Sequence, residues 1–462
     1  MISCEGYATK HVAVVGLGQS GLAAARALCR SGARVLAWDD GEAARKTAEV
    51  EGIPVREPSR INWAAQDALV LSPGIPHTYP KPHVAARMAK DAGVPIIGDV
   101  ELLITSGAQA PRIAITGTNG KSTTTALVGH ILESVDRDVE VGGNLGPAIS
   151  DMAMMEHDGA YVLELSSYQL ELCPSARFKV AVLLNIAPDH LDRHGGMHGY
   201  IMAKQQIFRG QGAGDTAIIG LDDEHSRQVY TDIKAANHRT VIGISCQGPV
   251  AGGIYVQDGM LINDVKGDAK RIMDVRGLQN LPGSHNAQNI AAAYAIACSM
   301  HVPTDDIVKA VKSFPGLAHR QERLGEIDGV TFVNDSKATN AEAAAKALAC
   351  YDNIHWILGG RAKDGGLDGL DGLYGSLTKA YVIGECAEDF ARQLTGKIDV
   401  QMCGDLETAT KAAFLDASGQ AATVLLSPAA ASFDQYRNFE VRGDAFREIV
   451  SALTRDATRG AA

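Results

Sequence analysis

Short apolar runs recur along the chain, and each ends in a loop that carries glycine or polar residues. Continuous apolar runs of four to six residues are typical of strands buried on both faces of a parallel sheet. Amphipathic stretches with helical spacing separate many of these runs. The alternation predicts an α/β fold with parallel sheets. The strands are expected at His11–Val15, Arg34–Trp38, Ala68–Leu71, Tyr161–Leu165, Val180–Asn185, Val330–Val333, Ile354–Leu358, Ala380–Ile383 and Thr423–Leu426.

One stretch, RIAITGTNGKSTTTA at residues 112–126, has the form of a strand, a glycine-rich turn and a helix start. Backbone N–H groups and the helix dipole at such a junction bind polyphosphate. Lys121 would reach the β- and γ-phosphates, and the hydroxyl of Ser122 or Thr123 would ligate Mg²⁺. Ile115 stands where the Walker pattern has its first glycine. The Lys-Ser pair directly after Gly120 nevertheless favours nucleotide binding over a simple turn.

A second glycine-rich turn, GLGQSG at residues 16–21, follows the first predicted strand. With Asp39 or Asp40 after the next strand, it fits a dinucleotide site or any other diphosphate across a parallel sheet. The alternative is that the glycines only permit close packing of helix on strand. Ser72-Pro-Gly74 lies after another strand, where open α/β sheets bind ligands.

The central segment carries a carboxylate and two histidines after predicted strands. Glu164 ends one strand beside the phosphate loop, where an Mg²⁺–nucleotide site needs an acid, although strands also end in acids by chance. His190 and His194 have the i, i+4 spacing of a zinc helix. Pro188 before them and the glycines at 195–196 after them make a long helix improbable, so we reject zinc and assign His190 a second-metal or substrate role.

Two further predictions in the central segment remain ambiguous. By pattern alone, Lys204 is a solvated lysine on an amphipathic helix at 199–208. Asn286 and Asn289 open an alanine-rich helix, so they suit either adenine contacts or, for Asn286, a helix cap.

In the C-terminal segment, three polar loops follow predicted strands, at residues 334–340, 359–366 and 427–434. Carboxyl ends of parallel strands meet at one edge of a sheet, so we expect these loops to converge. Each supplies a group suited to anions: Lys337, Lys363 and Ser432.

Composition limits the classes of partner. The net charge is 43 − 54 = −11, which argues against nucleic acid as the principal ligand. The eight cysteines are scattered without a C-x-x-C pair, as is usual in a reducing compartment. We find no apolar run of membrane-spanning length and no secretory pattern. We therefore expect a cytoplasmic protein without membrane insertion.

Together, the motifs resemble those of the Mur ligase family of ATP-dependent amide ligases over nearly the whole chain. GTNGKST is shared with folylpolyglutamate synthases, whereas NDSKATN and SPAAASFDQ are similar to the D-glutamate-adding members. The stretches that carry the resemblance are, in order, GLGQSG, SPGI, GTNGKSTTT, GGNLG, ELSSYQL, NIAPDHLDRH, GSHNAQN, HRQE, NDSKATN, GGRAKDGG and LSPAAASFDQYRNFEVRG.

The resemblance implies three domains: a Rossmann-like parallel sheet at residues 1–98, a P-loop-type ATPase domain at 99–315 and a C-terminal Rossmann-like α/β domain at 316–462. It implies catalytic roles for Lys121, His190, Lys204 and Lys337. It implies two Mg²⁺ ions, the first on Ser122 and Glu164 and the second on His190 and Lys204, with Lys204 carbamylated.

It further implies groups of binding residues. Those for ATP are Gly117, Thr118, Asn119, Gly120, Lys121, Ser122, Thr123, Asn286, Asn289, Arg320 and Asp335. Those for the UDP-sugar are Gly18, Gln19, Ser20, Gly21, Asp39, Ser72 and Gly74, with Asn144 near the reacting carboxylate. Those for the phosphates and the incoming amino acid are Asp335, Lys337, Thr339 and Lys363, and for D-glutamate Ser432, Phe433 and Phe439.

The implied activity is the addition of D-glutamate to UDP-N-acetylmuramoyl-L-alanine through an acyl phosphate, with release of ADP and phosphate, by a monomer. Closure of the C-terminal domain would exclude water from the acyl phosphate. A nicotinamide dehydrogenase would leave the phosphate loop without a function. A P-loop switch protein would need a guanine-reading N-K-x-D motif, which we do not find. A sister ligase that adds another amino acid is the nearest alternative.

Overall fold

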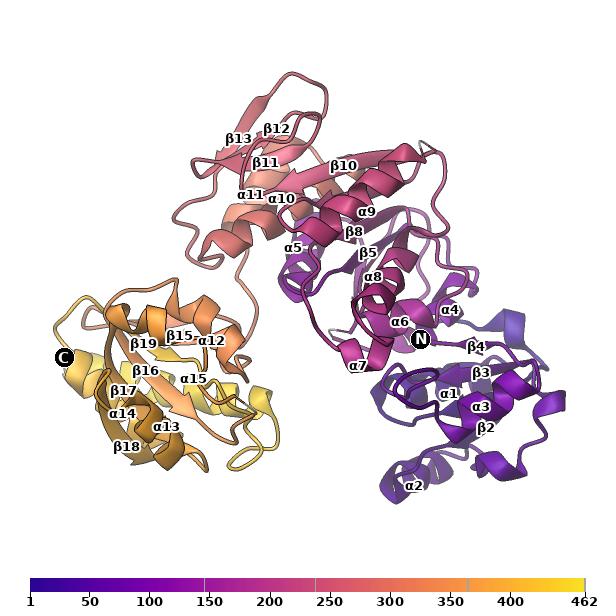
Figure 1. Cartoon of the computed structure of the whole chain (residues 1–462), viewed down its shortest axis with the longest axis horizontal. Coiled ribbons are helices and arrows are strands. Elements are labelled where there is room, and N and C mark those ends of the chain that lie inside the picture. Colours follow the sequence, from indigo (N-terminus) through magenta and orange to yellow (C-terminus); the bar gives the residue numbers. More distant parts are fainter. Residues whose placement is uncertain (145, 237, 364, 461–462) are drawn as a thin grey trace. The chain divides into compact units, whose positions relative to one another are not determined.

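The structure is a computed structural model that describes all residues except 145, 237, 364 and 461–462, and only the backbone of 284 and 456–460. In the described part of the chain, the strands form a four-stranded, a nine-stranded and a six-stranded sheet. Figure 1 shows each sheet within its own section of the sequence, from indigo through magenta to orange and yellow. The predicted α/β class with three domains is confirmed.

The N-terminal sheet is parallel throughout, in the order β2-β1-β3-β4. The strands β1 and β3 are almost entirely buried apolar runs, so the prediction of two-sided burial is confirmed for them. The strand β2 is only partly buried. The elements are β1 (His11–Val15), α1 (Gln19–Arg30), β2 (Arg34–Trp38), α2 (Glu42–Val50), β3 (Ala68–Leu71), α3 (Val84–Asp91) and β4 (Ile96–Ile97).

The central sheet has the order β13-β12-β11-β10-β9-β8-β5-β7-β6. It is parallel from β6 to β11, and β12 and β13 add an antiparallel extension. Its strands are β5 (Arg112–Thr116), β6 (Val139–Gly143), β7 (Ala160–Glu164), β8 (Val180–Leu183), β9 (Thr216–Gly220), β10 (Thr240–Ser245), β11 (Ile254–Gln257), β12 (Met260–Asn263) and β13 (Lys270–Asp274). Its helices are α4 (Asp99–Ile104), α5 (Lys121–Glu133), α6 (Ser167–Glu171), α7 (Leu191–His194), α8 (Met197–Gln205), α9 (Glu224–Ala235), α10 (Ser284–Ser299) and α11 (Thr304–Ser313).

The C-terminal sheet has the order β14-β15-β19-β16-β17-β18, with β14 antiparallel to β15. Because β19 lies between β15 and β16, the loops that follow these three strands leave from neighbouring positions, as predicted. Its elements are β14 (Glu322–Ile327), β15 (Val330–Asn334), α12 (Ala341–Leu348), β16 (Ile354–Gly359), β17 (Leu377–Ile383), α13 (Ala387–Leu394), β18 (Asp399–Gly404), α14 (Leu406–Ala417), β19 (Ala422–Leu426) and α15 (Phe439–Gly460).

The apolar cores divide the chain into two compact units. One buried cluster includes side chains of both the N-terminal and the central sheet, for example Val14 and Leu183. The C-terminal sheet has its own clusters on its two faces. The first unit comprises residues 1–275 and 285–313, and the second comprises 276–284 and 314–462. The domain boundaries at 98 and 315 stay predictions.

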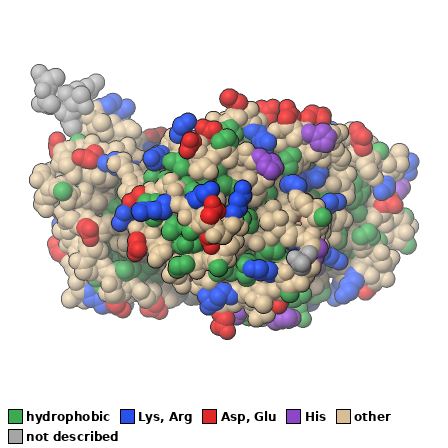
Figure 2. All heavy atoms as spheres, turned by 90° about the horizontal axis from the view of Figure 1, so that it is seen from above, with side chains coloured by type: hydrophobic (Ala, Val, Ile, Leu, Met, Phe, Trp, Pro, Cys, Tyr) green, Lys and Arg blue, Asp and Glu red, His purple; other side chains and the backbone are tan. Residues whose placement is uncertain are grey.

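Charged side chains of both signs are mixed on the surface. Over the face in Figure 2, Lys and Arg lie among Asp and Glu. None of the helices in the described part of the chain combines the length and apolarity that crossing a bilayer requires.

Candidate active site

The phosphate loop connects β5 to α5, as predicted. Gly120 ends the loop with a left-handed backbone, at φ 85°. A Cβ there would lie 2.3 Å from the Asn289 Oδ1 atom of α10. Only glycine fits both constraints, and the close approach shows that α10 begins directly beside the loop.

Two lysines converge on one carbonyl of this loop. Lys121 Nζ donates to the oxygens of Gly117 and Thr118 at 2.8 and 2.9 Å, and Lys204 Nζ donates to Gly117 O at 2.9 Å. Lys204 is only 2% exposed, so its pattern-based interpretation as a solvated lysine is wrong. Burial and the nearby Lys121 charge lower the pKa of Lys204 well below its usual value, against an opposing effect of Asp189.

Glu164 offers a free carboxylate oxygen next to the loop. It ends β7, which pairs with β5 so that Glu164 lies opposite Ile115. Its Oε1 atom accepts from Asn144 Nδ2 at 2.7 Å, whereas its buried Oε2 atom has no hydrogen-bond partner. Ser122 is buried in the first turn of α5. A carboxylate and a hydroxyl are the oxygen ligands that Mg²⁺ prefers, so these residues fit the implied ion.

The two histidines of the 187–194 segment lie in different surroundings. His190 is exposed, has φ 51° and lies 3.4 Å from the Asp189 carboxylate. His194 is buried between Glu171 Oε1 at 3.0 Å and Ser167 Oγ at 2.9 Å. The helix α7 has only four residues. The two imidazoles therefore do not share the face of a long helix, in agreement with the rejection of zinc.

The asparagines of α10 lie at the phosphate loop. Thr124 Oγ1 donates to Asn289 Oδ1 at 3.2 Å, and Asn289 Nδ2 donates to Asn286 Oδ1 at 2.9 Å. Because α10 begins at Ser284, Asn286 lies inside the first turn and is not its cap.

The N-terminal glycine turn is held by the residues expected to bind the UDP-sugar. The Asp39 carboxylate accepts from the N–H groups of Leu17 and Gly41 at 2.6 and 2.7 Å. Ser72 Oγ donates to Gly16 O at 2.8 Å. A Cβ at Gly21 would lie 1.7 Å from that oxygen, so Gly21 permits close packing of helix on strand, and its role in binding the UDP-sugar stays a prediction.

The remaining residues of this predicted site are open to solvent. Gly18, Gln19 and Gly74 are exposed, and Ser20 is half-buried. A Cβ at Gly18 or Gly74 would meet no atom within 4 Å. Gln19 Nε2 donates to Gly146 O of the central domain at 3.3 Å. Gly18 and Gly74 are therefore not required as glycines for packing.

In the C-terminal unit, Asp335 follows β15 and is 4% exposed. Its carboxylate accepts from Ser427 Oγ at 2.8 Å and from the N–H of Gln321 at 3.1 Å. Burial raises the pKa of Asp335 to about 7. Arg320 is half-buried one residue before Gln321.

The residues expected to bind the amino acid differ in exposure. Lys337 Nζ lies 5.3 Å from the centre of the Phe439 ring. Ser432 is buried, Thr339 is half-buried and Phe433 is 64% exposed. Each lies in one of the loops that follow β15 and β19, or, for Phe439, at the start of α15.

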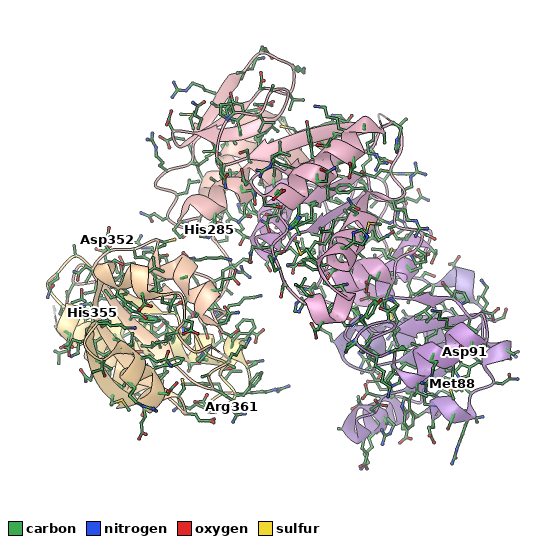
Figure 3. The ribbon with its side chains drawn as sticks, viewed as in Figure 1. Met88, Asp91, His285, Asp352, His355 and Arg361 are labelled. Carbon is green, nitrogen blue, oxygen red and sulfur yellow. The ribbon has the colours of Figure 1, made fainter. Side chains whose placement is uncertain are left out.

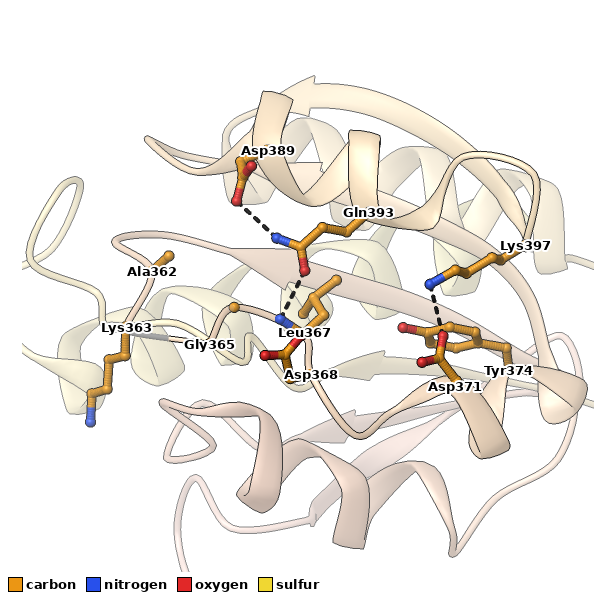
Figure 4. Close-up of a pocket in the computed structure, with 11 residues that line it drawn as sticks. Ala362, Lys363, Gly365, Leu367, Asp368, Asp371, Tyr374, Asp389, Gln393 and Lys397 are labelled. Carbon is orange, nitrogen blue, oxygen red and sulfur yellow. Dashed lines mark hydrogen bonds and ion pairs between the residues drawn. The ribbon is translucent and has the colours of Figure 1, made fainter.

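Lys363 lies beside a polar pocket of about 480 Å³. Figure 4 shows its side chain pointing away from Asp389 and Gln393. Gln393 joins Asp389 to the N–H of Leu367 at 2.8 and 3.0 Å, and Lys397 pairs with Asp371 at 2.7 Å. These polar groups satisfy one another within the pocket wall.

The interpretation of the sequence missed Arg442, although its motif stretch ends in VRG. This guanidinium is 1% exposed and donates to Ser336 Oγ, Ser336 O and Ala430 O at 3.0, 2.9 and 3.1 Å. It thereby joins the loops after β15 and β19. Burial lowers the pKa of Arg442 to about 10.

His355 is the second residue of β16, at the opposite end of the strand from these loops (Figure 3).

Comparison with known proteins identifies the family to which the chain belongs. The models for the Mur ligase MurD-like N-terminal domain, the Mur ligase middle domain and the Mur ligase glutamate ligase domain match residues 10–98, 115–297 and 319–430. The chain belongs to the Mur ligase family. The resemblance of the motifs to this family is thus confirmed.

Individual Mur ligases are similar over the full chain. A UDP-N-acetylmuramoylalanine–D-glutamate ligase of Caulobacter sp. (strain K31) is 50% identical, with 100% of both chains covered. One from Paramagnetospirillum magneticum is 48% identical over 98% of this chain and 99% of its own. The crystal structure of UDP-N-acetylmuramate–alanine ligase from Thermotoga maritima has the same fold, with a TM-score of 0.58, 17% identity and coverage of 96% and 99%.

Proposed function

We propose that this Mur ligase joins D-glutamate to UDP-N-acetylmuramoyl-L-alanine, with conversion of ATP to ADP and phosphate, in the synthesis of peptidoglycan precursors. The observation that carries the proposal is full-length identity of about 50% to ligases named for these two substrates. The phosphate loop with its two converging lysines supports the use of ATP.

In the first step, a carboxylate oxygen of the L-alanyl group attacks the γ-phosphorus of ATP, and the bond to the β-phosphate oxygen breaks. ADP leaves and an acyl phosphate forms. Phosphoryl transfer of this kind depends on positioning and on neutralising charge. Lys121 supplies a positive charge beside the loop, and the N–H groups at the start of α5 face the phosphates.

In the second step, the amine of D-glutamate attacks the acyl carbon, phosphate leaves and an amide bond forms. The amine must lose a proton before it attacks, and His190 contributes to the environment that favours this loss. The exposed imidazole beside Asp189 supports that role. Lys337, Thr339, Lys363, Ser432, Phe433 and Phe439 would hold the amino acid and the phosphates.

Two Mg²⁺ ions would neutralise phosphate charge when bound. Ser122 and Glu164 would hold the first, which the free Glu164 Oε2 atom supports. His190 and a carbamylated Lys204 would hold the second. Carbamylation needs a neutral amine, and the lowered pKa of Lys204 favours that form.

We further place the protein in the cytoplasm as a monomer. All eight cysteines are free thiols, as is usual where the cell keeps thiols reduced.

The test is phosphate release from ATP with UDP-N-acetylmuramoyl-L-alanine and a panel of single amino acids. We expect release that requires both the sugar nucleotide and D-glutamate. Release with another amino acid instead would make the protein a sister ligase. Release that does not depend on the sugar nucleotide would refute the proposed substrate and favour a folate-type ligase.

A further inference from the structure

Asn185, just after β8, holds two successive peptides of the phosphate loop. Its carbonyl oxygen accepts from the N–H of Thr118 at 3.0 Å. Its side-chain Oδ1 accepts from the N–H of Asn119 at 2.8 Å, and its Nδ2 donates to the oxygen of Asn119 at 3.2 Å. The Asn185 side chain therefore forms hydrogen bonds with both backbone polar groups of Asn119, as the backbone of a neighbouring strand would.

The Asn185 amide is the inner end of a longer chain of hydrogen bonds. Asn185 Nδ2 also donates to Gln288 Oε1 at 2.9 Å, and Gln288 Nε2 donates to Asp222 Oδ2 at 2.8 Å. Asp222 is fixed in turn by Ser245 Oγ at 2.6 Å and the N–H of Cys246 at 3.0 Å. Gln288 is 7% exposed, so water does not readily replace these bonds.

The chemistry of these side chains fixes the direction of donation along the series of hydrogen bonds. An ionised carboxylate only accepts hydrogen bonds, so Asp222 requires the NH₂ group of Gln288 to face it. The oxygen of Gln288 then faces Asn185 and requires its NH₂ group. The oxygen of Asn185 is thereby left for the N–H of Asn119. If either amide were turned over, two donors or two acceptors would face each other in a part-buried site, which is costly.

The same contacts determine which N–H groups remain for a nucleotide. Those of Thr118 and Asn119 are already occupied by Asn185. The first N–H groups of a helix have no partner within it. The phosphates would therefore bind the N–H groups from Gly120 onward, at the start of α5. The direction in which these N–H groups point depends on how the Asn119 peptide is held.

We propose that Asp222, Gln288 and Asn185 are positioning residues that fix the orientation of the phosphate loop through this polarised chain. The inference rests on the proposed binding of ATP at this loop. Gln288 lies between the two asparagines expected to contact the nucleotide, and its own role is to hold the loop in shape for the triphosphate.

The test reverses the polarity of one link and then restores it. Gln288→Glu keeps the oxygen that faces Asn185 but sets a second carboxylate against Asp222. Asp222→Asn alone can keep its amide oxygen on the NH₂ group of Gln288 and turn its own NH₂ group to Ser245 Oγ, which also accepts hydrogen bonds. We expect Gln288→Glu to raise the KM for ATP about tenfold, as loss of a hydrogen bond implies, with little change in kcat or in the KM for D-glutamate. Asp222→Asn alone should change the KM for ATP by less than about threefold.

The exchanged pair, Asp222→Asn with Gln288→Glu, provides a donor and an acceptor again in the opposite order. We expect its KM for ATP to return to within about threefold of the unaltered protein, because one hydrogen bond is worth little more than tenfold. The matched control is Asp232→Asn, an exposed aspartate of α9 whose carboxylate accepts from Gln228, and it should change nothing.

A purely structural role would lower the thermal transition temperature and kcat of Gln288→Glu and leave its KM for ATP unchanged. A Gln288→Glu variant that behaves like Asp232→Asn, or an exchanged pair no better than Gln288→Glu alone, would overturn the proposal. If Gln288→Glu does not fold, Gln288→Met replaces it with the same expected rise in KM.

Nucleotide affinity, measured with a fluorescent ATP analogue, separates this proposal from the proposed function. Binding by the unaltered protein without turnover would refute the ligase activity. The affinities of the variants would still test the role of the hydrogen bonds between Asp222, Gln288 and Asn185. Absence of binding by the unaltered protein would refute both.

Discussion

Lys121 and Lys204 both donate to the carbonyl oxygen of Gly117, although 83 positions separate them. A carbonyl that accepts hydrogen bonds from two lysine amines brings two nitrogen donors to one point of the phosphate loop. At the scale of single residues, this convergence is the strongest structural sign of polyphosphate chemistry.

We expect Lys121→Ala to abolish turnover. The substitution removes the cation nearest the phosphates, and a single cationic group in a phosphoryl-transfer site is worth roughly a thousandfold or more in rate. Phosphate release from ATP measures the effect, with Lys234→Ala on the exposed side of α9 as the control. Near-normal turnover would contradict the role assigned to Lys121.

Lys204→Ala should also be inactive, but for a different reason. If a carbamate at this position ligates Mg²⁺, a free short-chain carboxylate can enter the space left by the side chain. We therefore expect partial recovery of turnover when acetate, propionate or butyrate is added to Lys204→Ala, and none when they are added to Lys121→Ala. Full activity of Lys204→Ala without any added carboxylate would exclude the metal-ligand role.

The environment of Lys204 also shows what a sequence pattern omits. Helical spacing places a lysine on one face of α8, but it does not say that β5 and the phosphate loop lie against this face. The burial of Lys204 depends on contacts between residues far apart in the chain. The resemblance to a family placed Lys204 at the phosphate loop, where the structure has its amine, and its role as a metal ligand stays a prediction.

At the scale of elements, the strands of the parallel sheets were predictable because they are continuous apolar runs between glycine-bearing loops. The boundaries of β1, β2 and β3 agree with the prediction residue by residue. The extension by β12 and β13 was missed, since these short strands are half exposed and mix polar with apolar residues. Burial on two faces leaves a clear pattern, and burial on one face of a short hairpin does not.

The predicted convergence of the C-terminal loops follows from strand order, which sequence alone fixes only through general rules of α/β topology. Arg442 was missed because it lies in α15, a long amphipathic helix in which an arginine normally faces water. Its burial depends on the loops at Ser336 and Ala430, whose carbonyl groups accept its hydrogen bonds. A side chain that joins two loops, such as Arg442, cannot be recognised from the local sequence pattern of either loop.

At the scale of the whole molecule, the two compact units have separate apolar cores. Multidomain proteins commonly unfold in more than one step. We therefore treat the stability of the C-terminal unit as a quantity of its own, which calorimetry can assign to one transition. Its buried carboxyl group, Asp335, gives this transition a distinctive dependence on pH.

The pKa of Asp335 is raised to about 7 in the folded protein by burial, whereas an unfolded aspartate titrates near ~3.9. Between these values the folded chain keeps a proton that the unfolded chain has lost. The free energy of unfolding should therefore decrease as the pH rises through this window, by up to about 1.4 kcal/mol per pH unit, and level off above pH ~7. His319 and His355, whose pKa values are lowered by burial, act in the opposite direction near neutral pH.

Asp335→Asn isolates the contribution of the aspartate, because both histidines remain in the variant. We expect the unfolding free energy of the C-terminal transition to fall less steeply between pH 4.5 and 7 in Asp335→Asn than in the unaltered chain, by an amount that approaches about 1.4 kcal/mol per pH unit. Calorimetry in steps of pH measures the difference, and Asp328→Asn, an exposed aspartate between β14 and β15, is the control. Equal slopes in all three proteins would mean that Asp335 is ionised in the folded state. Its carboxylate would then be able to attract a cation or an ammonium group at neutral pH, rather than act as a neutral hydrogen-bonding group at the end of β15.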